Sequence, residues 1–350
     1  MPKNSSLRKA AKVKNDEFYT QYADIQREVN AYLEYNPDVF RNKTILLPCD
    51  DPEWSNFTLF FAQNFKNFGL KKLISTSYAV ESKQLEIDYQ PTNFEKYSSN
   101  FDETKTRCRG KIFTLDKDIN GDGKVDFKDL KWQYLEDDGD FNSDEGKKLR
   151  DEADIIITNP PFSLFREFLK WIMEAKKQFL ILGNMNAITY KEIFPYLKDN
   201  IIWLGVVNGA KEYITPTGEH KKMGNTCWFT NIDHGRRHTP LSLMSMEDNI
   251  KYSKHKEIKE KGYQKYDFYD AIEVPYTDAI PNDYNDLMGV PNSFLNKYCP
   301  EQFQIIDAIG RYSQLYGATE ETQGKYLTMV NGIHKFVRIV IKRKKKEISN

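Results

Sequence analysis

The sequence has few cysteines, and none of them are paired at a short spacing. Its four cysteines are Cys49, Cys108, Cys227 and Cys299, and no C-x-x-C motif occurs. This pattern does not indicate a disulfide framework. Free thiols persist in reducing compartments, so we expect a cytoplasmic protein.

Long apolar runs are absent as well. No stretch approaches the roughly 18 apolar residues that a membrane-spanning helix needs, so we expect a soluble protein without a membrane partner. The first residues, MPKNSSLRKAAKVKN, are basic and lack an apolar centre, which argues against a secretory signal.

An excess of charge of one sign is also missing. The chain has 51 Lys and Arg residues and 51 Asp and Glu residues, which argues against a purely electrostatic nucleic-acid binder but not against local basic patches. Residues 1–15 carry only basic charges. They form either a solvated tail or a basic N-terminal arm that contacts phosphates.

Aromatic residues, by contrast, are abundant. The 350 residues include 21 tyrosines and 22 phenylalanines, and this length allows one large domain or two ordinary ones. A large core uses many aromatic rings, and so does a surface that stacks on planar ligands.

Short apolar segments alternate with segments of helical periodicity in the first two thirds of the chain. The spacing predicts strands over residues 43–47, 72–78, 155–158, 179–182, 201–207 and 226–230. It predicts helices over residues 24–35, 56–68 and 164–176. Such alternation favours an α/β fold with a doubly wound, mainly parallel sheet, whose ligands bind beyond the carboxyl ends of the strands.

Two regions do not follow this alternation. Residues 80–150 are polar and acidic, and we interpret them as an insertion in a core that spans residues 16–231. Residues 232–350 show no clear pattern until a strand that leads into a basic tail near residues 335–346. We expect this C-terminal region to form a second part of the protein.

The segment ADIIITNPPFSLF places Asn159, Pro160, Pro161 and Phe162 at the end of a buried strand. An exocyclic amine on a planar ring is a poor nucleophile until both of its N–H groups donate to fixed acceptors. Asn159 offers a side-chain carbonyl, and Pro160 offers a backbone carbonyl whose φ is fixed and which Pro161 restrains further. Phe162 offers a face for stacking.

The alternative interpretation of this motif is an ordinary strand-to-helix turn that contains two prolines. The preceding residues Asp154-Ile-Ile-Ile-Thr put the motif at the carboxyl end of a strand, where ligands bind in such folds. This context favours a catalytic role.

Several long segments resemble the EcoRI-type adenine-specific DNA methyltransferases. They are KNDEFYTQYADI, PCDDPEWSNFTLFFAQNFKNFGLKKLI, TNPPFSLFREF, GNMNAITYKEIFP, GNTCWFTN, and MGVP followed by FLNKYCPEQFQI. The resemblance implies a class I, Rossmann-like methyltransferase with a C-terminal target-recognition region. It also implies S-adenosylmethionine as methyl donor and N6 of an adenine in double-stranded DNA as acceptor, in a restriction-modification type of system.

The resemblance also assigns roles to residues. Asn159, Pro160 and Phe162 would hold an adenine flipped out of the duplex, because N6 inside the duplex is out of reach of the donor. The donor-binding residues would be Phe18, Tyr19, Thr20, Asp50, Asp51 and Pro52. The turn at Asp50 has no G-x-G, unlike many methyltransferases, and its residues could instead cap the following helix. We expect a monomer, with a cognate restriction endonuclease as a partner.

Residues 118–129 match the pattern of a calcium-binding EF-hand loop. The oxygen ligands would be Asp118, Asn120, Asp122, Asp126 and Asp129. Gly123 stands at the sixth position, and Asp129 replaces the usual Glu at the twelfth. The alternative is an acidic surface turn. Any calcium bound here would be structural, because methyl transfer of this type needs no metal.

The C-terminal region is expected to bind DNA. Arg236, Arg237 and Arg338 are candidates for phosphate contacts, which give affinity without sequence information.

His234 and His238 stand four residues apart, and three interpretations are open for them: a zinc site, a phosphate-contacting turn and a plain exposed loop. Cys227 lies in an apolar strand without a neighbouring base, which indicates a buried thiol.

Two other functions are compatible with the motif. A methyltransferase that acts on RNA or protein could use the same Asn-Pro-Pro-Phe sequence. The other is a catalytically silent DNA- or calcium-binding protein, against which the intact Asn159 and Phe162 argue.

Overall fold

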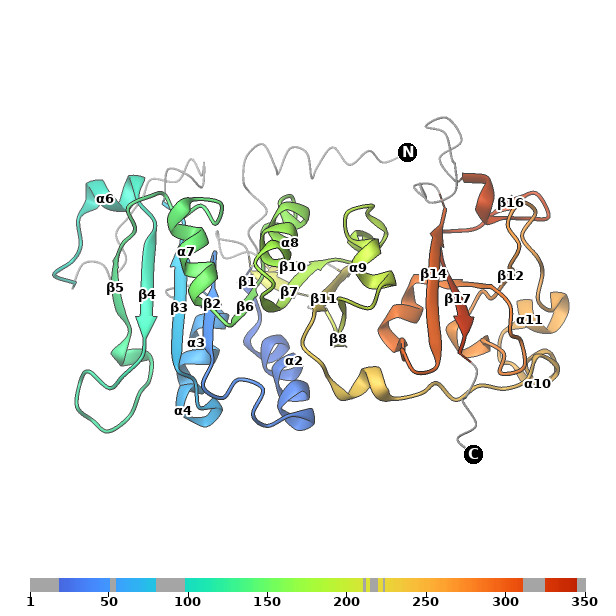
Figure 1. Ribbon diagram of the computed structural model, residues 1–350, viewed down its shortest axis with the longest axis horizontal. Helices are drawn as coiled ribbons and strands as arrows, with labels where there is room; N and C mark the ends of the chain where they lie inside the picture. Colours follow the sequence, from blue (N-terminus) through green and yellow to red (C-terminus); the bar gives the residue numbers. More distant parts are fainter. Residues whose placement is uncertain are drawn as a thin grey trace. The chain divides into compact units, whose positions relative to one another are not determined.

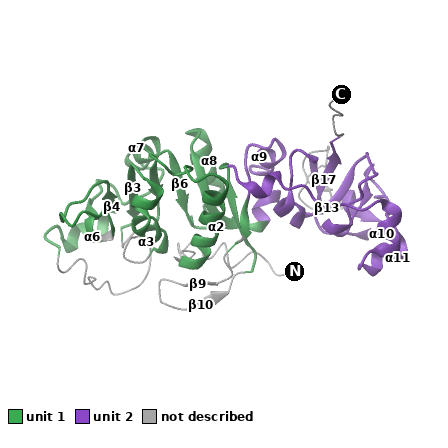
Figure 2. Ribbon diagram, turned by 90° about the horizontal axis from the view of Figure 1, so that it is seen from below, with its two compact units in different colours: residues 1–185, 205–232 green, residues 186–204, 233–350 purple. Residues whose placement is uncertain are grey.

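The computed structural model describes residues 19–50, 55–79, 98–209, 212–214, 220–222, 224–310 and 325–344. The chain divides into two compact units, one of residues 1–185 and 205–232 and one of residues 186–204 and 233–350 (Figure 2). Residues 186–204, which the sequence pattern assigns to the core, therefore belong to the second unit.

The described residues of the α/β core form an eight-stranded sheet with the order β5-β4-β3-β2-β6-β7-β11-β8 (Figure 1). Its strands are β2 (Thr44–Leu47), β3 (Lys72–Ser77), β4 (Lys111–Leu115), β5 (Lys131–Tyr134), β6 (Ile155–Thr158), β7 (Gln178–Asn184), β8 (Trp203–Asn208) and β11 (Thr226–Thr230). Strands β3, β2, β6 and β7 are parallel neighbours. The antiparallel strands are β11 against β7, β4 against β3 and β5 against β4. The α/β class with a parallel sheet centre is thus confirmed.

Helices cover both faces of this sheet. They are α2 (Tyr22–Tyr35), α3 (Asn56–Gln63), α4 (Phe65–Phe68), α6 (Glu103–Cys108), α7 (Asp144–Glu152) and α8 (Phe165–Glu174). Ile45 and Leu47 pack into one buried cluster with residues of α2 and α3. Leu46, between them, points to the other face and lies near Leu149 of α7 and Trp171 of α8. Alternate residues of β2 therefore pack against helices on opposite faces of the sheet.

The predicted helix over residues 56–68 is broken in two. Asn64 is the C-cap of α3, and Gly69 is the C-cap of α4; the φ of Gly69, 63°, is the left-handed conformation that favours glycine after a helix. The interruption lets the rings of Phe60, Phe61 and Phe68 pack together at centroid distances of 5.3 to 6.0 Å. Much of the aromatic excess of the sequence is used in this way, to fill the core.

The acidic insertion is part of the sheet rather than a separate module. Two of its segments form β4 and β5, which extend the edge beyond β3, and α7 leads back into β6. Ser77 pairs with Lys111, so α6 lies toward the carboxyl end of β3. Leu73 pairs with Leu115, so the loop of residues 118–129 lies toward the amino end of β3.

The second unit contains a four-stranded sheet with the order β12-β13-β17-β14. Its elements are β12 (Ile272–Glu273), β13 (Met288–Pro291), β14 (Phe303–Ile309), β15 (Met329–Val330), β16 (Ile333–His334), β17 (Arg338–Arg343), α9 (Phe194–Lys198), α10 (Met246–Tyr252) and α11 (Lys256–Lys261). Short 3-10 helices join them: η3 (Met185–Thr189), η4 (Gly235–His238), η5 (Thr277–Ala279), η6 (Asn292–Lys297) and η7 (Lys325–Thr328); η2 (Phe127–Asp129) lies in the insertion of the first unit.

A third, three-stranded sheet joins distant parts of the first unit. Strand β1 (Tyr19–Thr20) pairs with β9 (Glu212–Ile214), which pairs with β10 (His220–Lys222). In the part of the chain that the structure describes, no helix is long and apolar enough to cross a membrane.

Candidate active site

The carboxyl ends of β2 and β6 lie next to each other, because the two strands are parallel neighbours. The Thr158 hydroxyl, at the end of β6, lies 2.6 Å from the carbonyl oxygen of Pro48 and 2.5 Å from Oδ2 of Asp50. The predicted donor-binding turn and the predicted catalytic motif are thus brought together, and both belong to the first unit.

The catalytic motif leaves the sheet through a tight turn. Pro160 and Pro161 are buried, whereas Asn159 and Phe162 are half-buried. The Leu164 N–H donates to the Pro161 carbonyl at 2.9 Å, which closes the turn before α8 begins. Oδ1 of Asn159, the predicted amine acceptor, is shielded from solvent.

A glycine in β7 fixes the start of α8. A Cβ atom at Gly183 would lie 2.4 Å from the ring of Phe165, the first residue of α8, so only glycine leaves room for that ring. The Phe165 ring also packs on Phe229 at a centroid distance of 4.9 Å. This contact holds the end of the motif against the sheet.

Asp50 is buried at the centre of a set of hydroxyl groups. The Ser55 hydroxyl donates to Oδ1 of Asp50 at 2.7 Å, and the Thr158 hydroxyl reaches Oδ2. The Ser75 hydroxyl donates to the backbone carbonyl of Asp50, and Thr58 Oγ1 lies 2.9 Å from Ser75 Oγ. The carboxylate and the carbonyl of Asp50 are therefore both held by residues from neighbouring elements.

The N-cap of α3 is Ser55, whose side chain accepts the N–H of Phe57. Asp50 therefore does not cap this helix itself, and that alternative is wrong. Its carboxylate instead accepts the hydroxyl of the residue that does.

Thr20 approaches the same turn from the N-terminal side. The Asn56 side-chain amide donates to the Thr20 carbonyl at 2.8 Å, which joins β1 to the first turn of α3. The Thr20 hydroxyl is buried and has no hydrogen-bond partner among the described residues. A buried hydroxyl without a partner, on a strand joined to the first turn of α3, fits a polar ligand such as the predicted methyl donor.

The structure describes only part of the other predicted donor-binding residues. Tyr19 contributes its backbone to β1, where it pairs with Ile214. Phe18, Asp51 and Pro52 lie outside the described residues.

Sequence reasoning missed the hydroxyl groups around Asp50, which are Ser55, Thr58, Ser75 and Thr158. A signal existed for two of them. Thr158 follows three isoleucines in β6, and Ser75 follows Leu73 and Ile74 in β3; both are fully buried, and buried polar residues need a specific partner.

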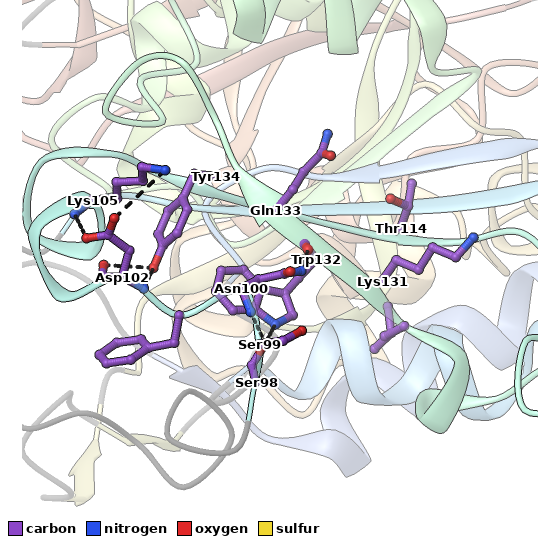
Figure 3. Close-up of a pocket in the computed structure, with 12 residues that line it drawn as sticks. Ser98, Ser99, Asn100, Asp102, Lys105, Thr114, Lys131, Trp132, Gln133 and Tyr134 are labelled. Carbon is purple, nitrogen blue, oxygen red and sulfur yellow. Dashed lines mark hydrogen bonds and ion pairs between the residues drawn. The ribbon is translucent and has the colours of Figure 1, made fainter.

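A hollow of about 860 Å³ lies elsewhere in the first unit, on the insertion. Figure 3 shows Asn100, Lys105, Lys131 and Gln133 along its wall, beside β5. Those predicted catalytic and donor-binding residues that the structure describes do not line this hollow. We therefore do not identify it with the active site.

The EF-hand-like loop is closed by its own hydrogen bonds. Asp118 accepts the N–H groups of Gly121 and Gly123, each at 2.7 Å, and Asp129 accepts those of Ile119 and Asn120. These backbone bonds lower the pKa of Asp129. Among the described residues, no group of three or more His, Cys, Asp or Glu could hold a metal ion, so calcium binding is not supported.

Arg237 and Arg338 are each only 8% exposed, and both are ion-paired. Arg237 bonds Asp233 at 2.7 Å, and its guanidinium carbon lies 3.5 Å from the ring centre of Trp203. Arg338 bonds the buried Glu273 at 2.6 Å. This geometry favours structural roles for both arginines, whereas Arg236 is half-buried.

The two histidines of the predicted C-terminal turn face different partners. His234 is buried with Nε2 3.0 Å from the Leu204 carbonyl, and burial lowers its pKa to about 4. His238 lies between Asp233 and Glu301 at 3.0 and 2.9 Å, and the bond to Asp233 raises its pKa. They do not form a zinc site.

Cys227 is 1% exposed, and burial raises the pKa of its thiol, which confirms a buried cysteine.

Comparisons with known proteins agree with this arrangement. The family model described as adenine-specific methyltransferase EcoRI matches residues 6–344. The chain is 39% identical to the type II methyltransferase M.EcoRI of Escherichia coli, over 98% of this chain and 97% of that protein.

Two mycoplasma proteins are also similar. The chain is 33% identical to the type II methyltransferase M.MgeORF184P of Mycoplasma genitalium, over 96% of this chain and 98% of that protein. It is 31% identical to the type II methyltransferase M.MpnI of Mycoplasma pneumoniae, over 97% and 98%. No solved structure gives a significant match.

The match to the family model covers nearly the whole chain, and the parallel sheet places the Asn-Pro-Pro-Phe motif beside the turn at Asp50. The chain therefore belongs to the EcoRI family of adenine-specific methyltransferases.

Proposed function

We propose that this enzyme methylates N6 of one adenine within a specific sequence of double-stranded DNA, with S-adenosylmethionine as donor. The observation that carries the proposal is the bond between Thr158 and Asp50, which joins the base-binding motif to the donor-binding turn. The unpaired Thr20 hydroxyl supports the same location for the donor.

In this proposal Asn159 to Phe162 receive a flipped adenine. Oδ1 of Asn159 and the Pro160 carbonyl accept the two N–H groups of N6, which moves the nitrogen lone pair out of conjugation with the ring. Phe162 stacks on the base. When bound, the donor supplies an electrophilic methyl group on its sulfonium. The two carbonyl groups are already oriented, so they stabilise the positive charge that develops on N6 without reorganisation.

No general base is needed for the transfer itself. Once N6 carries the methyl group it is positively charged and strongly acidic, so its proton is lost to water.

The second unit is proposed to recognise the DNA target. Arg236 and the basic residues at the end of β17, Lys342 and Arg343, are the candidates for phosphate contacts. We do not include Arg237 and Arg338, because their guanidinium groups are engaged by Asp233 and Glu273. Within a restriction-modification system, a monomeric cytoplasmic enzyme would protect host DNA from a cognate endonuclease.

The test uses donor labelled with tritium in its methyl group, offered separately with double-stranded DNA, RNA and protein. We expect label in DNA only, as 6-methyladenine. Label in RNA or protein instead would support the alternative substrates.

The site assignment is tested by Asn159→Ala, with Asn142→Ala as a matched control on the surface of the same unit, where Asn142 bonds Glu167. Loss of an oriented catalytic dipole typically lowers kcat about 100-fold or more, and we expect this for Asn159→Ala alone. Normal methylation by Asn159→Ala would refute the assignment.

A further inference from the structure

The bond between Thr158 and Asp50 joins the two turns that must cooperate in methyl transfer. Thr158 and Asp50 are 0% and 5% exposed, so the bond is shielded from water. A buried hydrogen bond to a carboxylate is stronger than one between neutral groups. The single hydroxyl hydrogen of Thr158 also has the Pro48 carbonyl within reach, at 2.6 Å.

The Asp50 side of this bond is held firmly. Ser55 holds the other carboxylate oxygen, and Ser75 holds the backbone carbonyl. Cys49, one residue earlier, has a φ of 68°, a left-handed conformation in which a non-glycine residue is kept only by its surroundings. Asp50 is therefore held by neighbouring elements, without the glycines that occur at this point in many methyltransferases.

The Thr158 side of the bond leads directly into the catalytic motif. Asn159 is the next residue, and consecutive Cα atoms are about 3.8 Å apart, so the position of Thr158 limits that of Asn159 closely. Methyl transfer requires nucleophile, methyl and leaving group in line, and a misplacement of about 1 Å can lower a rate about 100-fold.

We propose that Thr158 is a positioning residue for methyl transfer. Its hydroxyl, bonded to the Asp50 carboxylate, holds the base-binding motif in register with the donor-binding turn. This inference rests on the proposed function, and in particular on Asn159 as the residue that holds the amine.

A purely structural role for Thr158 would have a different signature. Loss of stability reduces the fraction of active enzyme, which lowers the amplitude of a single turnover. It leaves unchanged the rate constant of the molecules that do react. Loss of alignment lowers the rate constant itself.

The experiment compares Thr158→Val, which keeps the shape and removes the hydroxyl, with Thr158→Ser, which keeps the hydroxyl. The matched control is Thr230→Val, because Thr230 is also fully buried in the sheet and its hydroxyl donates to a carbonyl, that of Phe179 at 2.7 Å. Single turnovers are followed with saturating tritiated S-adenosylmethionine and saturating target DNA.

We expect the rate constant of Thr158→Val to fall about tenfold or more, as the loss of a hydrogen bond to a charged group allows. Thr158→Ser should recover most of the rate constant, and Thr230→Val should change only the amplitude. An unchanged rate constant in Thr158→Val would overturn the proposal, and so would an equal fall in Thr158→Ser.

A double-mutant cycle with Asp50→Asn tests whether Thr158 acts through Asp50. In the Asp50→Asn background, Thr158→Val should cost much less than in the wild type. Equal costs in both backgrounds would assign the effect to the Pro48 carbonyl and overturn the proposal. If Thr158→Val does not fold, Asp50→Asn alone weakens the same bond, and a wild-type rate constant in that variant would overturn it equally.

These outcomes are separable from a failure of the proposed function. If the wild type transfers no methyl group to DNA, the proposed function fails. If the wild type is active and Asn159→Ala is inactive while Thr158→Val keeps its rate constant, only the role of Thr158 is lost.

Discussion

Cys49 adopts a backbone conformation that most side chains avoid. Its φ of 68° lies in the left-handed region, and the residue follows Pro48 directly at the end of β2. The hydrogen bonds made by Asp50 hold the chain in this conformation from the other side. The residue thus occupies a position at which glycine would be free of strain.

A substitution series at position 49 measures this strain. We expect the free energy of unfolding of Cys49→Gly to lie within about 1 kcal/mol of the wild-type value. The relief of backbone strain in the folded state offsets the added freedom of the unfolded chain. Cys49→Val should be less stable than Cys49→Gly by about 1–2 kcal/mol, since a β-branched residue tolerates a positive φ poorly. Urea unfolding measures both, and equal stability of the two variants would contradict the strain.

Asp307, in β14 of the second unit, is a buried carboxyl group that lacks a full set of partners. It is 1% exposed, Oδ1 accepts the N–H of Ala308, and Oδ2 has no hydrogen bond among the described residues. Burial raises its pKa, although the Ala308 N–H and the charge of Lys198 act in the opposite direction. The residue lies at an irregularity in the pairing of β14 with β17.

The raised pKa predicts how stability depends on pH. The folded state favours protonated Asp307, so this contribution to stability is fully present below the ordinary value of 3.8 and is lost as pH rises through the folded pKa. Asp307→Asn should therefore gain stability over the wild type at pH 8 and gain less near pH 4.5. Thermal unfolding at both pH values tests this, with Asp270→Asn, at an exposed aspartate of the same unit, as the control for loss of a surface charge.

At the scale of elements, the ion pair between Arg338 and Glu273 joins β17 to β12. Their side chains are 10% and 4% exposed, and Tyr266 also donates to Glu273. Both strands flank β13 in the sheet order, so the pair spans the centre of the second unit. The pair therefore belongs to the framework of that unit.

Breaking this pair should destabilise the second unit. Arg338→Met leaves Glu273 buried without its partner, which typically costs about 3–5 kcal/mol. The double variant Arg338→Met/Glu273→Gln removes both charges and should recover most of that loss. Denaturant unfolding measures the effect. A stable Arg338→Met protein with selectively weakened DNA binding would instead support the phosphate contact predicted from the sequence.

For the chain as a whole, the register of the sheet separates the loop of residues 118–129 from the catalytic motif. The loop of residues 118–129 follows β4 near the amino end of β3, whereas Asn159 follows the carboxyl end of β6. Lys66 of α4 donates to the Gly123 carbonyl, which ties the loop to the helix that ends before β3. The loop is therefore at the opposite end of the strands from the catalytic motif.

This separation predicts that calcium does not affect catalysis. Addition of calcium, or of a calcium chelator, should leave the rate of methyl transfer unchanged, because the loop lies at the opposite end of the strands from the catalytic motif. Thermal unfolding in both conditions tests the loop itself. A midpoint that rises with calcium in the wild type but not in Asp118→Ala would show that the loop is a calcium site after all.

Features that depend only on neighbouring residues were predictable from the amino-acid sequence. The apolar run Ile155–Thr158 gives a strand buried on both faces, and the two prolines after Asn159 end it, so the strand and the motif were both predictable. Alternation of strands and helices likewise predicted the α/β class. Local patterns of this kind need no knowledge of what lies across the sheet.

Contacts between residues far apart in the chain depend on the folded structure. Asp50 and Thr158 are 108 positions apart, with the insertion between them, and nothing local indicates that their side chains bond. In the same way, the sequence does not distinguish an arginine that contacts a phosphate from one that, like Arg338, pairs with a buried glutamate. Strand pairing sets these partners, because the energy of a polar side chain depends on what the fold brings beside it.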